Sequence, residues 1–226
     1  MNLAAESPEH LGRSVGSLKL ALQTASRMGA RGVIFHVGSH KGAGFDQVHD
    51  QILAAVSDIL AHAPADTWLI LENSAGMGGS IGSAFSELGA IIRGIGDDRL
   101  RVCLDTCHSL AAGYEVRTRA GVEATMEEFD REIGLDRLVA VHANDSKVDL
   151  HGGKDRHENI GCGFIGEEGF LNLFAHPAFA EQPLLLEVPG VDRGGPDRPN
   201  VDALRSIRRR LGLPEPERPL LDRPSA

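Results

Sequence analysis

Five short apolar runs divide this chain, and each one ends at or just before a side chain that can bind a metal ion. The runs lie at 33–38, 68–73, 101–106, 138–145 and 184–190. They lack the polar alternation of strands that face water on one side, and segments with helical periodicity separate them. Such runs are typical of parallel strands that are buried under helices. The pattern predicts an α/β fold built on a parallel sheet.

The segments between the runs carry apolar residues at helical spacing. Ser7-Pro8 is typical of a helix start, and Gly29 is typical of the residue that follows a helix end. Between them, Leu11, Val15 and Leu18 fall on one helical face. Similar apolar faces recur within 52–60, 83–92, 122–133, 170–174 and 201–211.

Five strands are fewer than the eight of a closed (β/α)8 barrel, which usually takes about 250 residues. The chain has 226 residues. We therefore expect either an open sheet or an incomplete TIM barrel of about five parallel strands over residues 1–211, followed by a Pro-rich tail at 212–226. An incomplete barrel exposes two strand edges, which favours association through these edges. A complete barrel would be a monomer.

Composition excludes several classes of protein. Hydrophobic residues make up 42% of the chain, which indicates a globular protein. We find no apolar run of about 18 residues and no signal segment, so we expect no membrane span. The cysteines, which are Cys103, Cys107 and Cys162, are typical of reduced thiols in a cytoplasmic protein. The net charge of −9 argues against a surface that coats nucleic acid generally, but a local site can draw positive charge from metal ions.

The side chains at the run ends are carboxylates and imidazoles. They are His36, Glu72, Asp105, His108, His142, Asp155, His157 and Glu187. Each alone is explained by a core histidine or a capping aspartate, but eight at the same edge of a sheet favour metal ions. Glu72 and Glu187 stand inside apolar runs, where burial costs several kcal/mol unless the charge is paired or bound to metal. These ligand types suit catalytic zinc, manganese or iron, and two or three bridged ions suit phosphate ester hydrolysis.

Two glycine-rich stretches invite a nucleotide-binding interpretation. Residues 161–166 fit G-x-G-x-x-G, but they follow a charged loop instead of a strand, so the dinucleotide motif lacks its context. Residues 76–79 follow a strand, but Glu72 in front of them would repel a pyrophosphate. We expect both stretches to be flexible backbone that approaches a ligand closely.

Successive segments of the chain resemble the signatures of the endonuclease IV family. They are FHVGSHKG, ENSAGMG, CLDTCHSLAAGYEV, HANDSK followed by DRHENIGCGFIG, and LLLEVPG. The resemblance covers nearly all of residues 1–211. It implies a DNA-repair TIM barrel with three zinc ions that hydrolyses the phosphodiester 5′ to abasic sites in double-stranded DNA. A metal-dependent sugar isomerase or epimerase, which needs one or two ions, and an inactive remnant remain alternatives.

By motif, the resemblance gives the ligands separate roles. Glu72 would bridge two zinc ions, and His36 would bind the first of them. The second ion would be held by Asp105, His142 and Glu187, and the third by His108, Asp155 and His157. Glu72 and Glu187 would be catalytic, with Glu72 helping to position the nucleophile. Manganese is the alternative to zinc.

Three basic residues are candidates for DNA contacts. Arg156 lies in the DRH segment and is a phosphate contact by resemblance. Lys41 and Lys147 lie in loops expected at the same edge of the sheet. Ordinary surface charge explains the two lysines equally well. Because the chain is acidic overall, we expect DNA affinity to depend on local geometry and to fall with salt.

The resemblance also has a departure at the N-terminus. The family has a ninth ligand, a histidine at the end of its third strand, and a stretch ending in Ile-Asn-Leu soon after it. Met1-Asn2-Leu3 begins at that stretch. We therefore expect the first three strands, that histidine and the N-terminal DNA-gripping loops to be lacking. On that basis the chain should bind at least one metal ion but be a weak or inactive nuclease.

Overall fold

The computed structural model describes residues 1–213, so nearly all of the tail expected at 212–226 lies outside the described residues. The α-helices are α1 (Pro8–Arg27), α2 (Phe45–Ala61), α3 (Phe85–Ile95), α4 (Thr106–Ala112), α5 (Arg119–Glu132), α6 (Gly166–Ala175) and α7 (Arg198–Arg210). The strands are β1 (Gly32–Phe35), β2 (Trp68–Glu72), β3 (Leu100–Asp105), β4 (Leu138–His142), β5 (Asp145–Ser146), β6 (His157–Glu158) and β7 (Leu184–Leu185). Short 3-10 turns lie at Met77–Gly79, Leu135–Arg137 and Pro177–Phe179.

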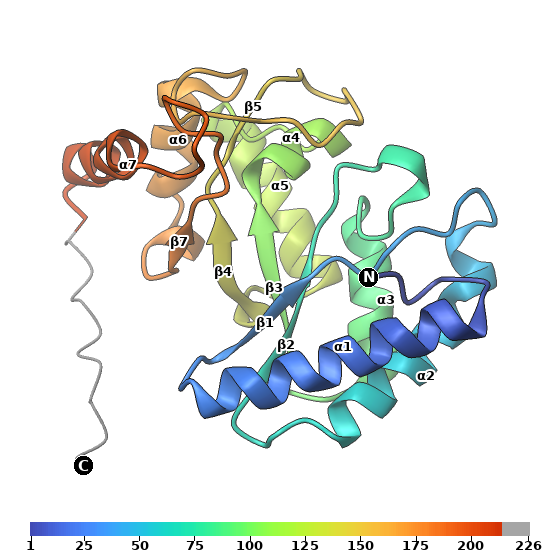
Figure 1. Ribbon diagram of the computed structural model, residues 1–226. Coiled ribbons are helices and arrows are strands. Elements are labelled where there is room, and N and C mark those ends of the chain that lie inside the picture. The colour runs from blue at the N-terminus through green and yellow to red at the C-terminus, as the bar shows by residue number, and fades with distance from the viewer. Residues whose placement is uncertain (214–226) are drawn as a thin grey trace, which may run out of the picture.

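Five strands form one parallel sheet in the order β1-β2-β3-β4-β7. Figure 1 shows the loops that follow β3 and β4 gathered at the top of the molecule. β5 and β6 form a separate antiparallel ribbon of two residues each above the sheet. Within residues 1–213, β1 and β7 are the edges of the parallel sheet. The expected fold, an incomplete barrel of about five parallel strands, is confirmed.

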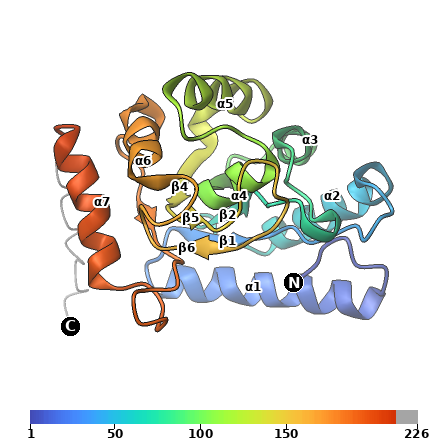
Figure 2. The same ribbon diagram turned by 90° about the horizontal axis from the view of Figure 1, so that it is seen from above.

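The main core lies between the outer face of the sheet and the helices. Leu69 and Leu71 of β2 and Val102 and Leu104 of β3 are at most 1% exposed and belong to this core. Viewed from above, helices α1, α2, α3, α5, α6 and α7 follow one another in an arc outside the strands (Figure 2). Burial of these alternate strand residues under amphipathic helices fixes which face of each strand points outward.

The opposite face of the sheet carries a smaller apolar layer. Ile70, Cys103 and Ala140 form its buried centre, and Ile34 and Trp68 pack against them. Side chains alternate along a strand, so the residue two positions further on points to the same face. In β2, β3 and β4 that next residue is Glu72, Asp105 and His142, respectively. The inner apolar layer therefore supports a layer of polar side chains at the carboxyl ends of the strands.

Two local features differ from the sequence expectations. The run expected as a strand at 184–190 is a strand only at Leu184–Leu185, because it pairs only with β4 and the backbone of Glu187 turns away to Asn144. The helix α4, Thr106–Ala112, was not expected, because seven residues are too few for a clear helical period. Within the part of the chain that the structure describes, no helix is long and apolar enough to span a membrane.

Candidate metal centre

Eight carboxylate and imidazole side chains predicted from the sequence converge at the carboxyl end of the sheet. The structure brings them into three groups whose ligand atoms lie within 4.8 Å of one another. We call these the strand group (Glu72, Asp105, His142 and Glu187), the loop group (His108, Asp155 and His157) and the edge group (His36, Glu72 and His108). Glu72 and His108 each belong to two groups, so the three candidate ion positions adjoin one another.

The strand group places three carboxylates around one imidazole. His142 Nδ1 lies 2.7 Å from Glu72 Oε1, 3.2 Å from Glu187 Oε2 and 3.9 Å from Asp105 Oδ2. Glu72, Asp105 and His142 are at most 6% exposed, whereas the Glu187 side chain is 49% exposed. The expected burial of Glu187 is therefore wrong, since β7 ends at Leu185 and leaves Glu187 outside the sheet.

Charge balance in the strand group depends on histidine. Burial alone would lower the pKa of His142, but hydrogen bonds to Cys103, Glu187 and Glu72 outweigh it and raise the pKa far above its usual range. Among residues 1–213, the ion-pair partners of the carboxylates in the three groups are all histidines. Buried carboxylates without a lysine or arginine partner form a strongly negative site that suits a divalent cation.

The loop group shows two histidines whose free nitrogens have no hydrogen-bond partner. Nε2 of His108 and Nε2 of His157 are buried and unpartnered, although each lies 3.3 Å from Asp155 Oδ1. The other ring nitrogen of each is close to a backbone carbonyl: His108 Nδ1 is 3.0 Å from Asn73 O, and His157 Nδ1 is 3.2 Å from Glu187 O. A carbonyl only accepts, so Nδ1 carries a proton in each ring, and Nε2 is the nitrogen that can bind a metal ion once it holds no proton.

Two acid–base properties follow from the loop group. Burial would lower the pKa of His108, but the charges of Asp105, Asp155 and Glu72 outweigh it and raise the pKa to about 9. The His108 imidazole in turn lowers the pKa of Asp155 to about 2. Asp155 is thus a carboxylate at neutral pH, and a metal ion at this position would have to displace a proton from His108.

The edge group is the least complete of the three. His36 Nε2 lies 3.4 Å from Glu72 Oε2, and the His36 side chain is 45% exposed. His108 approaches the same carboxylate, with Nδ1 3.5 Å from Glu72 Oε1. The His36 and His108 rings are 5.2 Å apart between centroids. The structure thus adds His108 to the pair expected from the sequence, but His108 also belongs to the loop group.

Two asparagines that the sequence reasoning missed position the ligands. Asn73 Oδ1 accepts from the backbone N–H of Asp105 at 2.6 Å. Asn144 Nδ2 donates to Asp105 Oδ2 at 2.7 Å, and its Oδ1 accepts from the backbone N–H of Glu187 at 2.8 Å. Asn73 stands one residue after the ligand Glu72, and Asn144 stands two residues after the ligand His142. This nearness in the sequence is the signal that could have identified them. Partners of this kind orient ligands and tune metal affinity.

The helix α4 fixes the spacing between Asp105 and His108. Asp105 is its N-cap, and Oδ1 accepts from the backbone N–H of His108 at 2.8 Å. The same carboxylate leaves Oδ2 directed at His142 and His157, at 3.9 and 3.5 Å. One cap interaction therefore places a strand-group ligand and a loop-group ligand in fixed relation.

Cysteine is the weakest ligand type in the centre. Cys107 lies with Asp105 and His157 within the same 4.8 Å limit, and Cys103 belongs to the inner apolar layer. Burial raises the pKa of Cys103 to about 11 and of Cys107 to about 12. Both are thiols at neutral pH, which agrees with the expectation that carboxylates and imidazoles predominate.

The residues proposed from the sequence for DNA contacts lie on the loops around the centre. Lys41 is exposed in the β1–α2 loop, and Arg156 is exposed and donates to Asp155 O at 2.6 Å. The Lys147 side chain is 48% exposed and lies 3.7 Å from Glu158. Lys41 has a left-handed backbone, φ 48°, as do His151 and Arg193 in two other loops, φ 63° and 58°. Such strain in non-glycine residues clusters at functional sites.

Comparison with known proteins places this geometry in a family context. Residues 1–210 match the family described as xylose isomerase-like TIM barrels. The probable endonuclease 4 of Methanoculleus marisnigri is 40% identical over 208 residues, which are 91% of this chain and 73% of that protein. The probable endonuclease 4 of Halothermothrix orenii is also 40% identical, over 91% of this chain and 74% of that protein.

Solved structures give the same result. Endonuclease IV from Thermus thermophilus superposes with a TM-score of 0.79 at 32% identity, over 93% of this chain and 73% of that chain. A D-tagatose 3-epimerase-like protein superposes with a TM-score of 0.74 at 20% identity, over 94% of this chain and 74% of that chain. The second likeness, at this low identity, shows a common fold. This chain spans about three quarters of the length of these relatives.

Proposed function

The chain belongs to the endonuclease IV family, and from this premise we propose that it is a DNA-repair hydrolase that cleaves the phosphodiester 5′ to abasic sites. The substrate is damaged double-stranded DNA, and the cofactors are divalent ions, zinc in the first place and manganese as the alternative. The observation that carries the proposal is the convergence of strand, loop and edge groups at one rim of the sheet.

The donor set fits such ions. Two buried Nε2 atoms without hydrogen-bond partners meet one carboxylate in the loop group, and three carboxylates meet one imidazole in the strand group. Imidazole and carboxylate are the usual ligands of catalytic zinc. Bound divalent ions would lower the pKa of a water molecule and stabilise negative charge on the phosphate oxygens. The strand and loop groups would each hold one ion, and the edge group would hold a third more weakly because it shares Glu72 and His108.

The protein's own residues contribute position and charge. Glu72 is buried between the strand and edge groups, so it is placed to orient the attacking water. Glu187 is half-exposed at the opening, where its carboxylate reaches both His142 and solvent. Asn144 fixes the Glu187 backbone, which keeps this carboxylate at the opening. We assign catalytic roles to Glu72 and Glu187 on these grounds.

Basic loop residues would hold the DNA backbone. Lys41, Lys147 and Arg156 are exposed on loops next to the centre, and Lys41 is held in a left-handed conformation. We assign them phosphate contacts. Because these contacts would neutralise phosphates and release counterions, binding should fall as salt is raised, even though the whole chain has a net charge of −9.

A duplex oligonucleotide with a single tetrahydrofuran abasic analogue tests this function. The zinc-loaded chain should incise the strand 5′ to the analogue, at the low rate expected from the sequence, and leave a 3′-hydroxyl that a polymerase extends. Prior treatment with a chelator should abolish incision, and an intact duplex of the same sequence should resist it. Absence of incision by a chain shown to contain bound zinc would contradict the proposal.

A sugar isomerase or epimerase is the second candidate, because the strand group alone supplies what a single catalytic ion needs. The loop group separates the two functions, since an isomerase has no use for a further ion at His108, Asp155 and His157. A substitution of Asp155 that removes nuclease activity therefore favours the first proposal. Turnover of a ketose by the same preparation, unaffected by that substitution, would favour the second.

A further inference from the structure

The glycine segment at 161–166 is held firmly, which differs from the flexible backbone expected from its sequence. The carboxylate of Asp145 is fully buried and accepts hydrogen bonds from the backbone N–H groups of Gly163 and Ile165, each at 2.9 Å, and of Gly166 at 3.2 Å. A Cβ on Gly163 would lie 2.4 Å from Ser146 O. The segment therefore packs directly against the β5–β6 ribbon.

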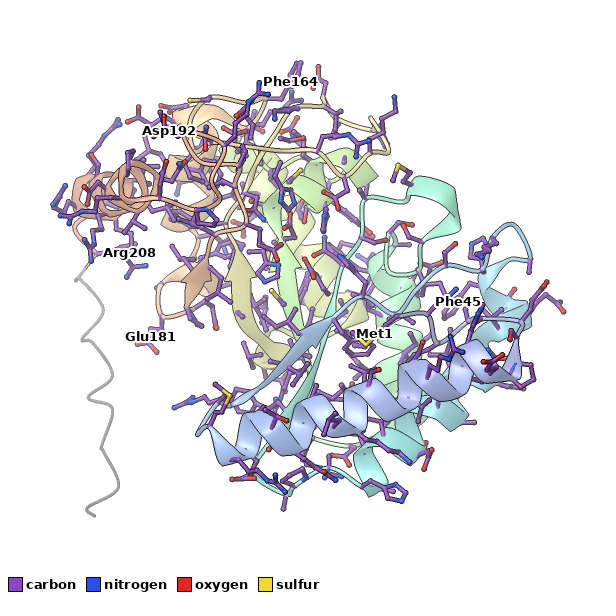
Figure 3. All side chains as sticks on the ribbon, in the orientation of Figure 1. Met1, Phe45, Phe164, Glu181, Asp192 and Arg208 are labelled. Atoms are coloured by element: carbon purple, nitrogen blue, oxygen red, sulfur yellow. The ribbon has the colours of Figure 1, made fainter. Side chains whose placement is uncertain are left out.

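This fixed segment presents an aromatic ring to solvent. The Phe164 N–H donates to Ser146 O at 2.8 Å, while the residue is 49% exposed. Figure 3 shows Phe164 at the top of the molecule, on the side to which the carboxyl ends of β3 and β4 point. An exposed ring on a fixed backbone loses little freedom when a ligand stacks on it, which favours binding.

A pocket of about 370 Å³ opens beside the ring. Its lining consists of Ser146, Lys147, Glu158, Cys162, Gly163 and Phe164. The same lining carries both charges, and Lys147 Nζ lies 3.7 Å from Glu158 Oε2. The pocket thus combines a stacking surface, a cation and a hydrogen-bond acceptor.

The pocket adjoins the metal centre through the β5–β6 ribbon. Ser146 pairs with His157, and the Lys147 N–H donates to Arg156 O at 2.8 Å. Because side chains alternate along a strand, His157 points toward the loop group while the neighbouring Glu158 points to the other side, into the pocket. A ligand in the pocket would therefore lie one strand away from a candidate metal ion.

We propose that this pocket binds one nucleotide of the DNA strand that the metal centre cleaves; the identification of that strand rests on the proposed function. The base stacks on Phe164, Lys147 contacts the adjacent phosphate, and Glu158 accepts a hydrogen bond from an exocyclic amino group. Adenine, cytosine and guanine carry such a group and thymine does not, so the pocket favours the first three.

Cys162 provides a readout that needs neither metal nor cleavage. It is the exposed cysteine of the three in the chain, since Cys103 and Cys107 are buried. The rate at which dithiobis(nitrobenzoate) modifies Cys162 is measured in EDTA against increasing concentrations of the trinucleotides d(AAA) and d(TTT). We expect saturating d(AAA) to slow the modification of Cys162. The same protection should need a concentration of d(TTT) about tenfold higher, which is the usual effect of one hydrogen bond.

Three variants sharpen the measurement. Phe164→Ala should weaken d(AAA) binding by about 5- to 100-fold, the range for loss of one stacked base. Lys147→Gln should weaken both trinucleotides alike, and Glu158→Gln should reduce the preference for d(AAA). Met77→Ala, which removes an exposed apolar side chain from another loop at the same end of the sheet, should leave binding unchanged.

Three outcomes would overturn the proposal: no protection of Cys162 by either trinucleotide, equal protection by inorganic phosphate alone, or protection that Phe164→Ala leaves unchanged. The proposed function is tested separately by incision. A chain that incises abasic DNA without protection of Cys162 loses only this inference. A chain that shows protection but never incises keeps a nucleotide pocket and loses the nuclease assignment.

Discussion

The strand group and the loop group, which are the two main ion sites proposed above, are held in place by different parts of the fold. In the strand group, Glu72, Asp105 and His142 stand on neighbouring strands, two residues beyond a buried apolar residue of the same face. In the loop group, Asp155 and His157 come from the segment around β6, and His108 comes from the short helix α4. The sheet fixes the first group, whereas hydrogen bonds to backbone carbonyls orient the second.

This difference suggests a division of roles within the centre. Strand positions are set by the hydrophobic core and tolerate little movement. The side chains of the strand group should therefore lose little conformational entropy when an ion binds. The loop group contains the 47% exposed carboxylate of Asp155 and depends on a longer segment. We therefore expect the strand group to dominate affinity and the loop group to adjust to the substrate.

His142→Ala should have the largest effect, because it removes a ligand and the main counter-charge of the strand group. We expect incision to fall by more than about 100-fold, beyond the usual loss from an outer-shell partner. The metal-free variant should also lose roughly 3–5 kcal/mol of stability, as Glu72 would stay buried without the histidine that is hydrogen-bonded to it. Incision kinetics and urea unfolding measure the two effects, with the exposed His62→Ala as control. Wild-type activity in His142→Ala would exclude an ion in the strand group.

His157→Ala should separate the two groups. Loss of this loop-group ligand should remove one ion per chain and leave the ion of the strand group in place. Incision should slow by about 100-fold, because removal of a ligand should cost at least as much as loss of an outer-shell partner. Metal content per chain after gel filtration, read by mass spectrometry, checks the stoichiometry. If both ions were lost together, the strand group and the loop group would not be held in place independently of one another.

Raising the pH should destabilise the metal-free protein. His108 has a pKa of about 9 in the folded state, because Asp105, Asp155 and Glu72 outweigh burial, against about 6.5 when unfolded. The folded state therefore binds the proton more tightly, and this stabilisation is complete below pH 6.5 and is lost as pH rises through 9. We expect a loss of up to about 3 kcal/mol, measured by thermal unfolding, while zinc affinity rises over the same range. A metal-free melting temperature that increases with pH would refute this.

Asn144→Ala should have the smallest of these effects and act mainly on the strand group. It removes one hydrogen bond to Asp105 and one to the backbone of Glu187. Zinc affinity should fall by about tenfold, typical of an outer-shell partner. Titration against a fluorescent zinc chelator measures the change, with Asn172→Ala on α6, which removes a hydrogen bond to Arg117 O, as the matched control. Equal losses in both variants would mean a general effect on stability.

Much of the centre was predictable because the strand alternation that builds the core also selects the ligands. Glu72 and Asp105 stand at the carboxyl ends of their strands, two residues beyond Ile70 and Cys103 on the same face. Parallel strands bring such ends together, so convergence follows from the sequence pattern alone. The incomplete barrel was predictable for the same reason, since each apolar run corresponds to one strand.

Other features depend on hydrogen bonds that no periodicity encodes. Glu187 was expected to be buried within a strand, yet its N–H bonds to Asn144 and the strand ends at Leu185. The glycine segment was expected to be flexible, yet the buried carboxylate of Asp145 binds three of its N–H groups. Both cases turn on polar residues directly after a strand, in the segment His142 to Ser146.

Anomalous diffraction at the zinc absorption edge, from crystals of the chain grown with zinc, tests the central claim most directly. We predict one strong peak among Glu72, Asp105, His142 and Glu187 and a second among His108, Asp155 and His157. A weaker third peak should lie near His36. Zinc bound only at surface sites, with no peak between Glu72 and His142, would contradict the account.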